Sequence, residues 1–183
     1  EIPNVCEDQL GTVFSIAPSI EYLERAADSV KYGRLPDSPY MEFTIPSVVN
    51  PDFAPNGKHV LSATIQNAPY TMRDQHWSEG LKNQLKQNVI RVLENYLPGI
   101  SSKIESSSLL TPVDMEDQFN LTEGNLNHGE MTLDQFFFMR PTISSSQYGY
   151  PINNLFLCGP GTHPGGGLHG LNAVNAAHEI LKY

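Results

Sequence analysis

Two intervals of the chain carry apolar residues at helical spacing. The first, residues 19–32, repeats them every three or four positions and stops before Gly33, a residue that commonly ends helices. The second, residues 78–97, keeps the same spacing over more turns and is followed by Pro98 and Gly99. Each interval therefore predicts an amphipathic helix.

Two other stretches alternate apolar and polar residues, which is the period of a strand. They are residues 40–49 and 61–66, and the connection between them is rich in proline and contains Asn56-Gly57. Strands of this pattern bury one face and leave the other in water, so we expect an antiparallel pair. The stretch 104–110 is predicted to return to the same sheet.

The C-terminal region follows a different pattern. Residues 155–158 are continuously apolar, which is typical of a strand buried in a parallel sheet. Glycines follow, and residues 167–181 have helical spacing. Upstream, Thr111 and Pro112 form a typical helix start. Together these elements predict an α+β fold.

Composition narrows the function classes. The 183 residues have a formal net charge of −9, which disfavours contact with nucleic acid phosphates. No stretch approaches the roughly 18 apolar residues of a membrane span. Cys6 and Cys158 form no disulfide framework, and we expect Cys158 to be a small buried thiol in a reducing compartment. The chain opens on Glu1 without methionine, so we expect it to be part of a longer protein.

The most informative segment is the glycine loop that follows residue 158. Five of the nine positions 159–167 are glycine, at a cost of about 0.5–1 kcal/mol each relative to alanine in regular structure. A strand, a glycine loop and a helix start form the geometry of a cofactor site, because the first amides of a helix attract electron-rich groups. A dinucleotide-binding fingerprint is incomplete here, since Pro164 occupies the third glycine position. A tight connection without a ligand is the alternative.

The segment 154–167 resembles the C-terminal FAD-contacting motif of the phytoene desaturase-like flavoproteins. Upstream segments resemble other parts of that family: residues 31–33, 44–47 and 54–60 its substrate domain, and residues 124–125, 127–131 and 140–141 the stretch before its final strand. The group that the chain resembles most is the phytoene dehydrogenase-like oxidoreductases that include the mitochondrial pyridine nucleotide-disulphide oxidoreductase domain proteins.

The resemblance implies the C-terminal third of an FAD-dependent oxidoreductase that abstracts hydride from a C–H bond. Residues 1–125 would belong to the substrate-binding domain, and residues 126–183 would complete a Rossmann-like FAD domain with a strand, the glycine loop and a helix. FAD would also need an N-terminal ADP-binding unit, which this chain lacks. The residues expected to contact the cofactor are Gly159, Gly161, Thr162, His163, Gly165, Gly166, Gly167 and Leu168.

The resemblance also implies a role for the start of the last helix. We expect the amides of about Gly166 to Leu168 to face the flavin and favour its reduction, because a helix N-terminus stabilises negative charge. The expected partners are the N-terminal part of the same enzyme, a small hydrophobic or amine-like substrate, and a second copy of the chain. The expected location is the cytoplasm or the mitochondrial matrix.

Other residues offer weaker candidates. His128 is either a substrate-facing side chain or a loop histidine bonded to backbone. The run Phe136, Phe137, Phe138 and Met139 is interpreted as core, with a hydrophobic substrate wall as the alternative. Arg140 either approaches a phosphate or carboxylate or lies on the surface at a helix end. The histidine spacing predicts no metal site, and no residue is predicted to be catalytic. The alternative function is a non-catalytic cap or interaction domain with an empty glycine loop.

Overall fold

The computed structural model describes residues 9–182, and the chain divides into two compact units, Glu1–Thr111 and Pro112–Tyr183. Helices and a small antiparallel sheet occur together, which confirms the α+β class. Among residues 9–182 the structure contains no Rossmann-like sheet. The predicted division after residue 125 into substrate and FAD domains stays a prediction, because compactness does not identify either domain.

The sheet of the first unit has the strand order β1-β2-β3, with β1 at Phe14–Ile16, β2 at Met41–Thr44 and β3 at Ser62–Ile65. Both pairings are antiparallel, and Met41 pairs with Ile65. The predicted strand pair is confirmed, although β2 is shorter than expected because Pro46 begins the short helix α2, Pro46–Val49. The predicted strand at 104–110 is wrong, since that stretch has no regular structure.

Both predicted helices of this unit are confirmed. Helix α1 spans Ile20–Lys31, and the Ser19 hydroxyl at its N-terminus accepts the Tyr22 N–H at 3.1 Å. Helix α3 spans Glu79–Tyr96, and Ser78 serves as the N-terminal cap in the same way. A capping hydroxyl satisfies an amide that the helix leaves unpaired, typically stabilising it by about 1 kcal/mol.

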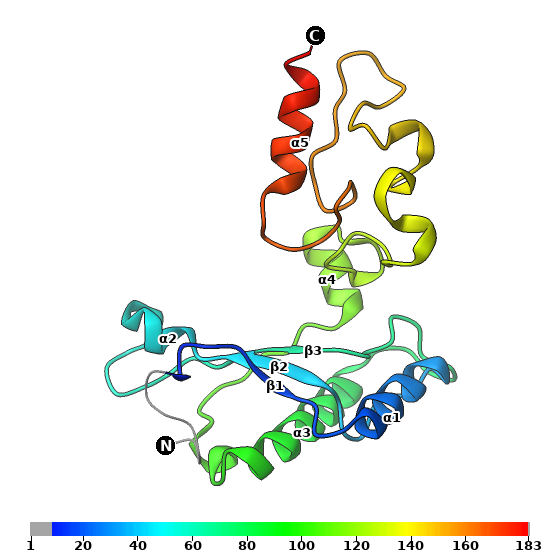
Figure 1. Ribbon diagram of the computed structural model, residues 1–183. Coiled ribbons are helices and arrows are strands. Elements are labelled where there is room, and N and C mark those ends of the chain that lie inside the picture. The colour runs from blue at the N-terminus through cyan, green and yellow to red at the C-terminus, as the bar shows by residue number, and fades with distance from the viewer. Residues whose placement is uncertain (1–8, 183) are drawn as a thin grey trace. The chain divides into compact units, whose positions relative to one another are not determined.

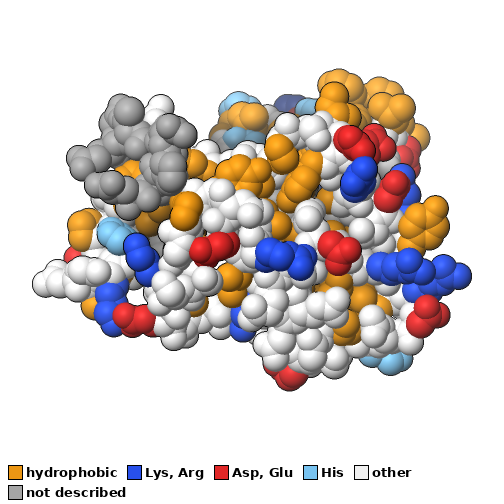
Figure 2. Space-filling view, turned by 90° about the horizontal axis from the view of Figure 1, so that it is seen from below, with side chains coloured by type: hydrophobic (Ala, Val, Ile, Leu, Met, Phe, Trp, Pro, Cys, Tyr) orange, Lys and Arg blue, Asp and Glu red, His pale blue; other side chains and the backbone are white. Residues whose placement is uncertain are grey.

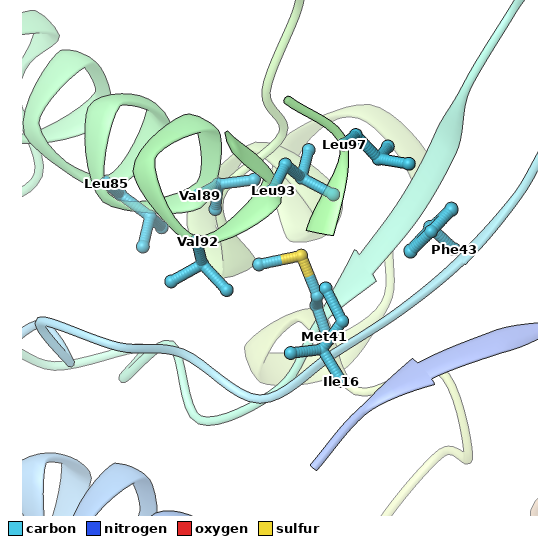
Figure 3. Packing of buried hydrophobic residues seen from close by; sticks show 8 residues of the cluster. All are labelled: Ile16, Met41, Phe43, Leu85, Val89, Val92, Leu93 and Leu97. Carbon is cyan, nitrogen blue, oxygen red and sulfur yellow. The ribbon is translucent and has the colours of Figure 1, made fainter. Parts of the chain in front are cut away.

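The core of this unit lies between α3 and one face of the sheet (Figure 1). The helix contributes three residues of the face that its spacing predicted, Leu85, Val89 and Val92, whereas Tyr96, predicted on the same face, is 42% exposed. The strands contribute alternate residues of β1 and β2. Figure 3 shows these side chains converging: Leu85, Val89, Val92, Leu93 and Leu97 against Ile16, Met41 and Phe43. All eight are at most 8% exposed, so this contact holds the unit together.

Between residues 112 and 182 the second unit contains two α-helices joined by mostly irregular chain. Helix α4, Pro112–Phe119, begins where predicted, and α5 spans Leu171–Ile180. In Figure 1, α5 (red) runs beside the irregular segment that precedes the glycine loop (orange). Short 3-10 turns complete the described chain, at Pro51–Phe53, Ile100–Lys103, Thr122–Gly124, Leu133–Gln135, Phe137–Met139 and Ile143–Ser145.

The surface carries charges of both signs. On the face drawn in Figure 2, Lys and Arg side chains are interspersed with Asp and Glu. Several form exposed pairs, such as Arg25 with Glu21 and Lys58 with Glu105. Within residues 9–182, every helix is too short or too polar to cross a bilayer.

Candidate functional site: the glycine loop of residues 159–170

The segment that leads into the glycine loop is not a buried strand. Phe156 forms only an isolated bridge with Gly149, Leu155 is 40% exposed, and Cys158 is an exposed free thiol. The predictions of a parallel-sheet strand at 155–158 and of a buried Cys158 are therefore wrong for this structure. The physical reason is that residues 9–182 supply no strand beside this segment that could cover it.

The last helix begins later than predicted. It starts at Leu171 rather than Gly167, and Gly170 precedes it in the left-handed region with φ of 70°. His169 stabilises this start, because its Nδ1 accepts the Leu171 N–H at 3.1 Å while its Nε2 lies 3.1 Å from the Gly166 carbonyl. The amides of Gly166 to Leu168 consequently belong to the loop, and the expectation that they open the helix is wrong.

Three side chains hold the carbonyl groups of the loop. Asn172, buried in the first turn of α5, has its Nδ2 2.9 Å from the Thr162 carbonyl, with the Gly159 and Gly165 carbonyls also within 3.2 Å. Tyr148 is buried, and its hydroxyl donates to the His163 carbonyl at 2.8 Å. The Thr162 hydroxyl donates to Gly159. These bonds fix the loop from its protein side.

A fourth side chain, Arg140, contacts the loop and its neighbouring segment. It is 1% exposed, and its guanidinium donates to the carbonyls of Pro160, Asn127 and Glu130. The predicted surface position is wrong, because Arg140 is buried, whereas its approach to a phosphate or carboxylate stays a prediction. Its hydrogen-bond partners in the described chain are backbone carbonyls. Arg140 therefore ties the segment around residues 127–130 to the loop.

The direction of the carbonyls determines the direction of the loop amides. A trans peptide is planar, and its N–H points opposite to its C=O. The N–H groups of Gly161, His163 and Gly166 follow the bonded carbonyls of Pro160, Thr162 and Gly165, so they point away from the side chains that hold the loop. No acceptor for these three amides lies within residues 9–182. Free backbone amides of this kind attract anions and electron-rich groups.

The glycines of the loop differ in the space around them. A Cβ atom on Gly159 would meet nothing within 4 Å, and on Gly161 only the His128 Cβ at 3.9 Å. A Cβ on Gly165 would lie 2.7 Å from Met131, and on Gly166 it would collide with the side chain of Asn127. Protein packing thus explains Gly165 and Gly166, whereas Gly159 faces open space and Gly161 has room for a Cβ beside His128.

The aromatic residues near the loop are exposed. Phe136, Phe137 and Phe138 are 37%, 66% and 65% exposed, so their interpretation as core is wrong. They follow one another in and beside a 3-10 turn, which turns successive side chains outward in different directions. The Phe137 ring lies 5.9 Å from the ring of His163, a residue of the loop.

Sequence reasoning overlooked the residues that shape the loop. Asn172 and Tyr148 were not predicted, although an asparagine in the first turn after a glycine loop is a usable signal. His128 is exposed next to Gly161, and its role as a substrate-facing or structural histidine stays a prediction. The described residues include no group of three His, Cys, Asp or Glu that could hold a metal ion.

The chain is similar in sequence to several known proteins. No family model matches it. It is 40% identical over 161 residues, 87% of its length, to the mouse pyridine nucleotide-disulfide oxidoreductase domain-containing protein 2. It is 32% identical over 69% of its length to a lycopene-forming phytoene desaturase of Pantoea ananas, and 30% identical over 75% to a neurosporene-forming phytoene desaturase of Cereibacter sphaeroides.

The chain belongs to the phytoene desaturase-like family. The resemblance inferred from the sequence is confirmed by these matches. The chain spans 28% of the length of the mouse relative and 25% of each of the two desaturases.

Proposed function

We propose that this chain is the C-terminal part of an FAD-dependent oxidoreductase and that its glycine loop binds the flavin end of the cofactor. The matches to desaturases and to an oxidoreductase domain protein support an oxidoreductase role. FAD, when bound, supplies a hydride acceptor. The residues of this chain bind and orient that group, and an N-terminal unit of the same polypeptide supplies the ADP-binding contacts.

The observation that carries this proposal is the arrangement of the loop amides. Asn172, Tyr148 and Arg140 hold the loop carbonyls, and the amides of Gly161, His163 and Gly166 point the other way. Hydrogen-bond donors without acceptors suit the carbonyl and nitrogen edge of a flavin or its diphosphate. The residues present therefore fit the group.

The open positions at Gly159 and Gly161 give a second line of support. Neither glycine needs its conformational freedom for a left-handed backbone. A Cβ added to either one would meet no atom, beyond the adjacent residues of the chain, closer than 3.9 Å. A ligand that approaches the backbone there would explain both glycines. Thr162 lies between these two glycines and Gly165, is 2% exposed, and holds the loop shape through the bond from its hydroxyl to the Gly159 carbonyl.

The test is the Gly161→Ala variant of the full-length protein that contains this chain. We expect its dissociation constant for FAD to rise at least tenfold, equivalent to about 1.4 kcal/mol, with unchanged circular dichroism. Gly159→Ala should raise the dissociation constant for FAD by a similar factor. Gly149→Ala is the matched control, since its Cβ also meets nothing within 4 Å but it lies outside the loop. If Gly161→Ala and Gly159→Ala bound FAD with the same dissociation constant as Gly149→Ala, the proposal would be contradicted.

The remaining elements of the proposal concern partners and substrate. Leu168, Leu171, Val174 and Leu181 are all at least 50% exposed around α5. We propose that the N-terminal part of the same polypeptide covers them, and that the isolated chain self-associates through them. A small hydrophobic or amine-like molecule is the proposed substrate, with the exposed Phe137 and Phe138 near the loop as its apolar surroundings.

The same exposed residues favour a second candidate, a non-catalytic cap or interaction domain. Such a domain would bind a partner through this apolar surface, and its loop amides would donate hydrogen bonds to water. Purification of the full-length protein separates the two candidates. A colourless protein that gains no flavin absorbance when FAD is added supports the second, and bound FAD supports the first.

A further inference from the structure

Arg140 is unusual among the charged residues of the described chain. Its side chain is among the most buried, at 1% exposure, yet residues 9–182 place no carboxylate within ion-pair distance of it. Its acceptors are the carbonyls of Asn127, Glu130 and Pro160, at 2.6, 3.3 and 3.0 Å. All three are neutral groups, so no carboxylate of residues 9–182 forms an ion pair with the guanidinium.

An uncompensated buried cation is costly. Moving a guanidinium out of water costs several kcal/mol even after relaxation, and buried charges are normally paired. Carbonyl dipoles offset part of this cost, but they leave the net charge in place. In a dry environment that charge acts over longer distances than it would in water.

Arg140 lies directly against the glycine loop. Its Nε and Nη2 both donate to the Pro160 carbonyl, and its Nε would be 3.8 Å from a Cβ on Gly165. The peptide between Pro160 and Gly161 therefore has the cation at its oxygen end and the open Gly161 amide at its other end. A cation at the carbonyl oxygen also polarises that amide and strengthens it as a hydrogen-bond donor.

We propose that Arg140 is a positioning residue that aligns the Gly161 amide and supplies positive charge beneath the loop, so that the loop favours a negatively charged flavin ring. This inference rests on the proposed function of the loop. It concerns the electron affinity of the flavin rather than the retention of FAD. Arg140 acts through the Pro160–Gly161 peptide and need not touch the cofactor.

Sulfite is the probe that tests this in the full-length holoenzyme. It adds reversibly to oxidised flavin and leaves the ring negatively charged, so its affinity reports positive charge near the ring. The wild type is expected to bind sulfite, Arg140→Lys to bind it within about threefold of wild type, and Arg140→Met at least tenfold more weakly, a difference of about 1.4 kcal/mol. Arg25→Met, which removes an exposed arginine on α1, should leave sulfite affinity unchanged.

The outcomes separate the two proposals. A wild type that holds FAD but forms no sulfite adduct overturns the role of Arg140 whatever the variants do, even if Arg140→Met does not fold. Sulfite affinity that is equal in Arg140→Met and wild type overturns it too, and so does a loss confined to FAD affinity, which would place the charge near the diphosphate. A wild type without FAD overturns both this inference and the proposed function.

Discussion

Replacing Gly166 with alanine should destabilise the second unit through one identifiable collision. The new Cβ would overlap the end of the Asn127 side chain and lie 2.6 Å from its Cγ and 3.0 Å from its Cβ. Rotating that side chain away costs about 0.5–1.5 kcal/mol if it leaves its rotamer well. The Asn127 backbone cannot follow easily, because its carbonyl accepts from Arg140 at 2.6 Å. We therefore expect a loss of about 1–3 kcal/mol, the usual range for overpacking.

Native-state hydrogen exchange on the 183-residue chain measures this loss, because it resolves the two units where a single unfolding curve would not. The free energy of opening at α5 should fall by that amount, and at α3 it should stay unchanged. Gly159→Ala is the control and should be neutral or stabilise by up to about 1 kcal/mol, since alanine restricts the unfolded chain. Adding Asn127→Ala to Gly166→Ala should restore most of the loss. Equal effects of both glycine substitutions, or no rescue, would refute the steric argument.

Three further predictions concern the core, the loop and pH. Leu85→Ala should destabilise the first unit by about 2–5 kcal/mol, measured by hydrogen exchange at α3, since Leu85 is 2% exposed; a loss below 1 kcal/mol would contradict the core assignment. Asn172→Leu should cost about 1–3 kcal/mol at α5 by exchange, because loop carbonyls lose their donor; unchanged protection would contradict it. Amides of Ser101 and Gly99 lower the pKa of Glu94, so the stability advantage over Glu94→Gln should be present above about pH 4.3 and lost as pH falls further. A constant difference from pH 7 to pH 3 would contradict the last prediction.

Local patterns predicted most of the first unit. The apolar stripe of α3 and the alternation in β2 and β3 are each visible in a few neighbouring residues. Both patterns agree with the structure, because the stripe packs against the apolar face of the sheet. Strand β1 escaped prediction because Phe14–Ile16 is too short to show a period. The stretch 104–110 looked strand-like in composition, but no edge of the sheet binds it in the structure.

The glycine loop was recognised from its sequence, whereas the side chains that hold the loop in place were not. Glycine content identifies a place where another group could approach the backbone. Only coordinates tell whether that place is filled by Asn127, as at Gly166, or is open, as at Gly159. The contacts of Arg140, Tyr148 and Asn172 with the loop link residues 7 to 20 positions apart, and no periodicity encodes them. Residues 155–158 resembled a buried strand because their composition is apolar, and composition cannot report which strands stand beside them.

The central claim is that the glycine loop binds the flavin end of FAD. A crystal structure of the full-length protein with FAD bound tests it most directly. We expect electron density for the cofactor within hydrogen-bond distance of the Gly161 amide and in van der Waals contact with Gly159. Cofactor density at another place, or protein atoms filling the space in front of these two glycines, would contradict it.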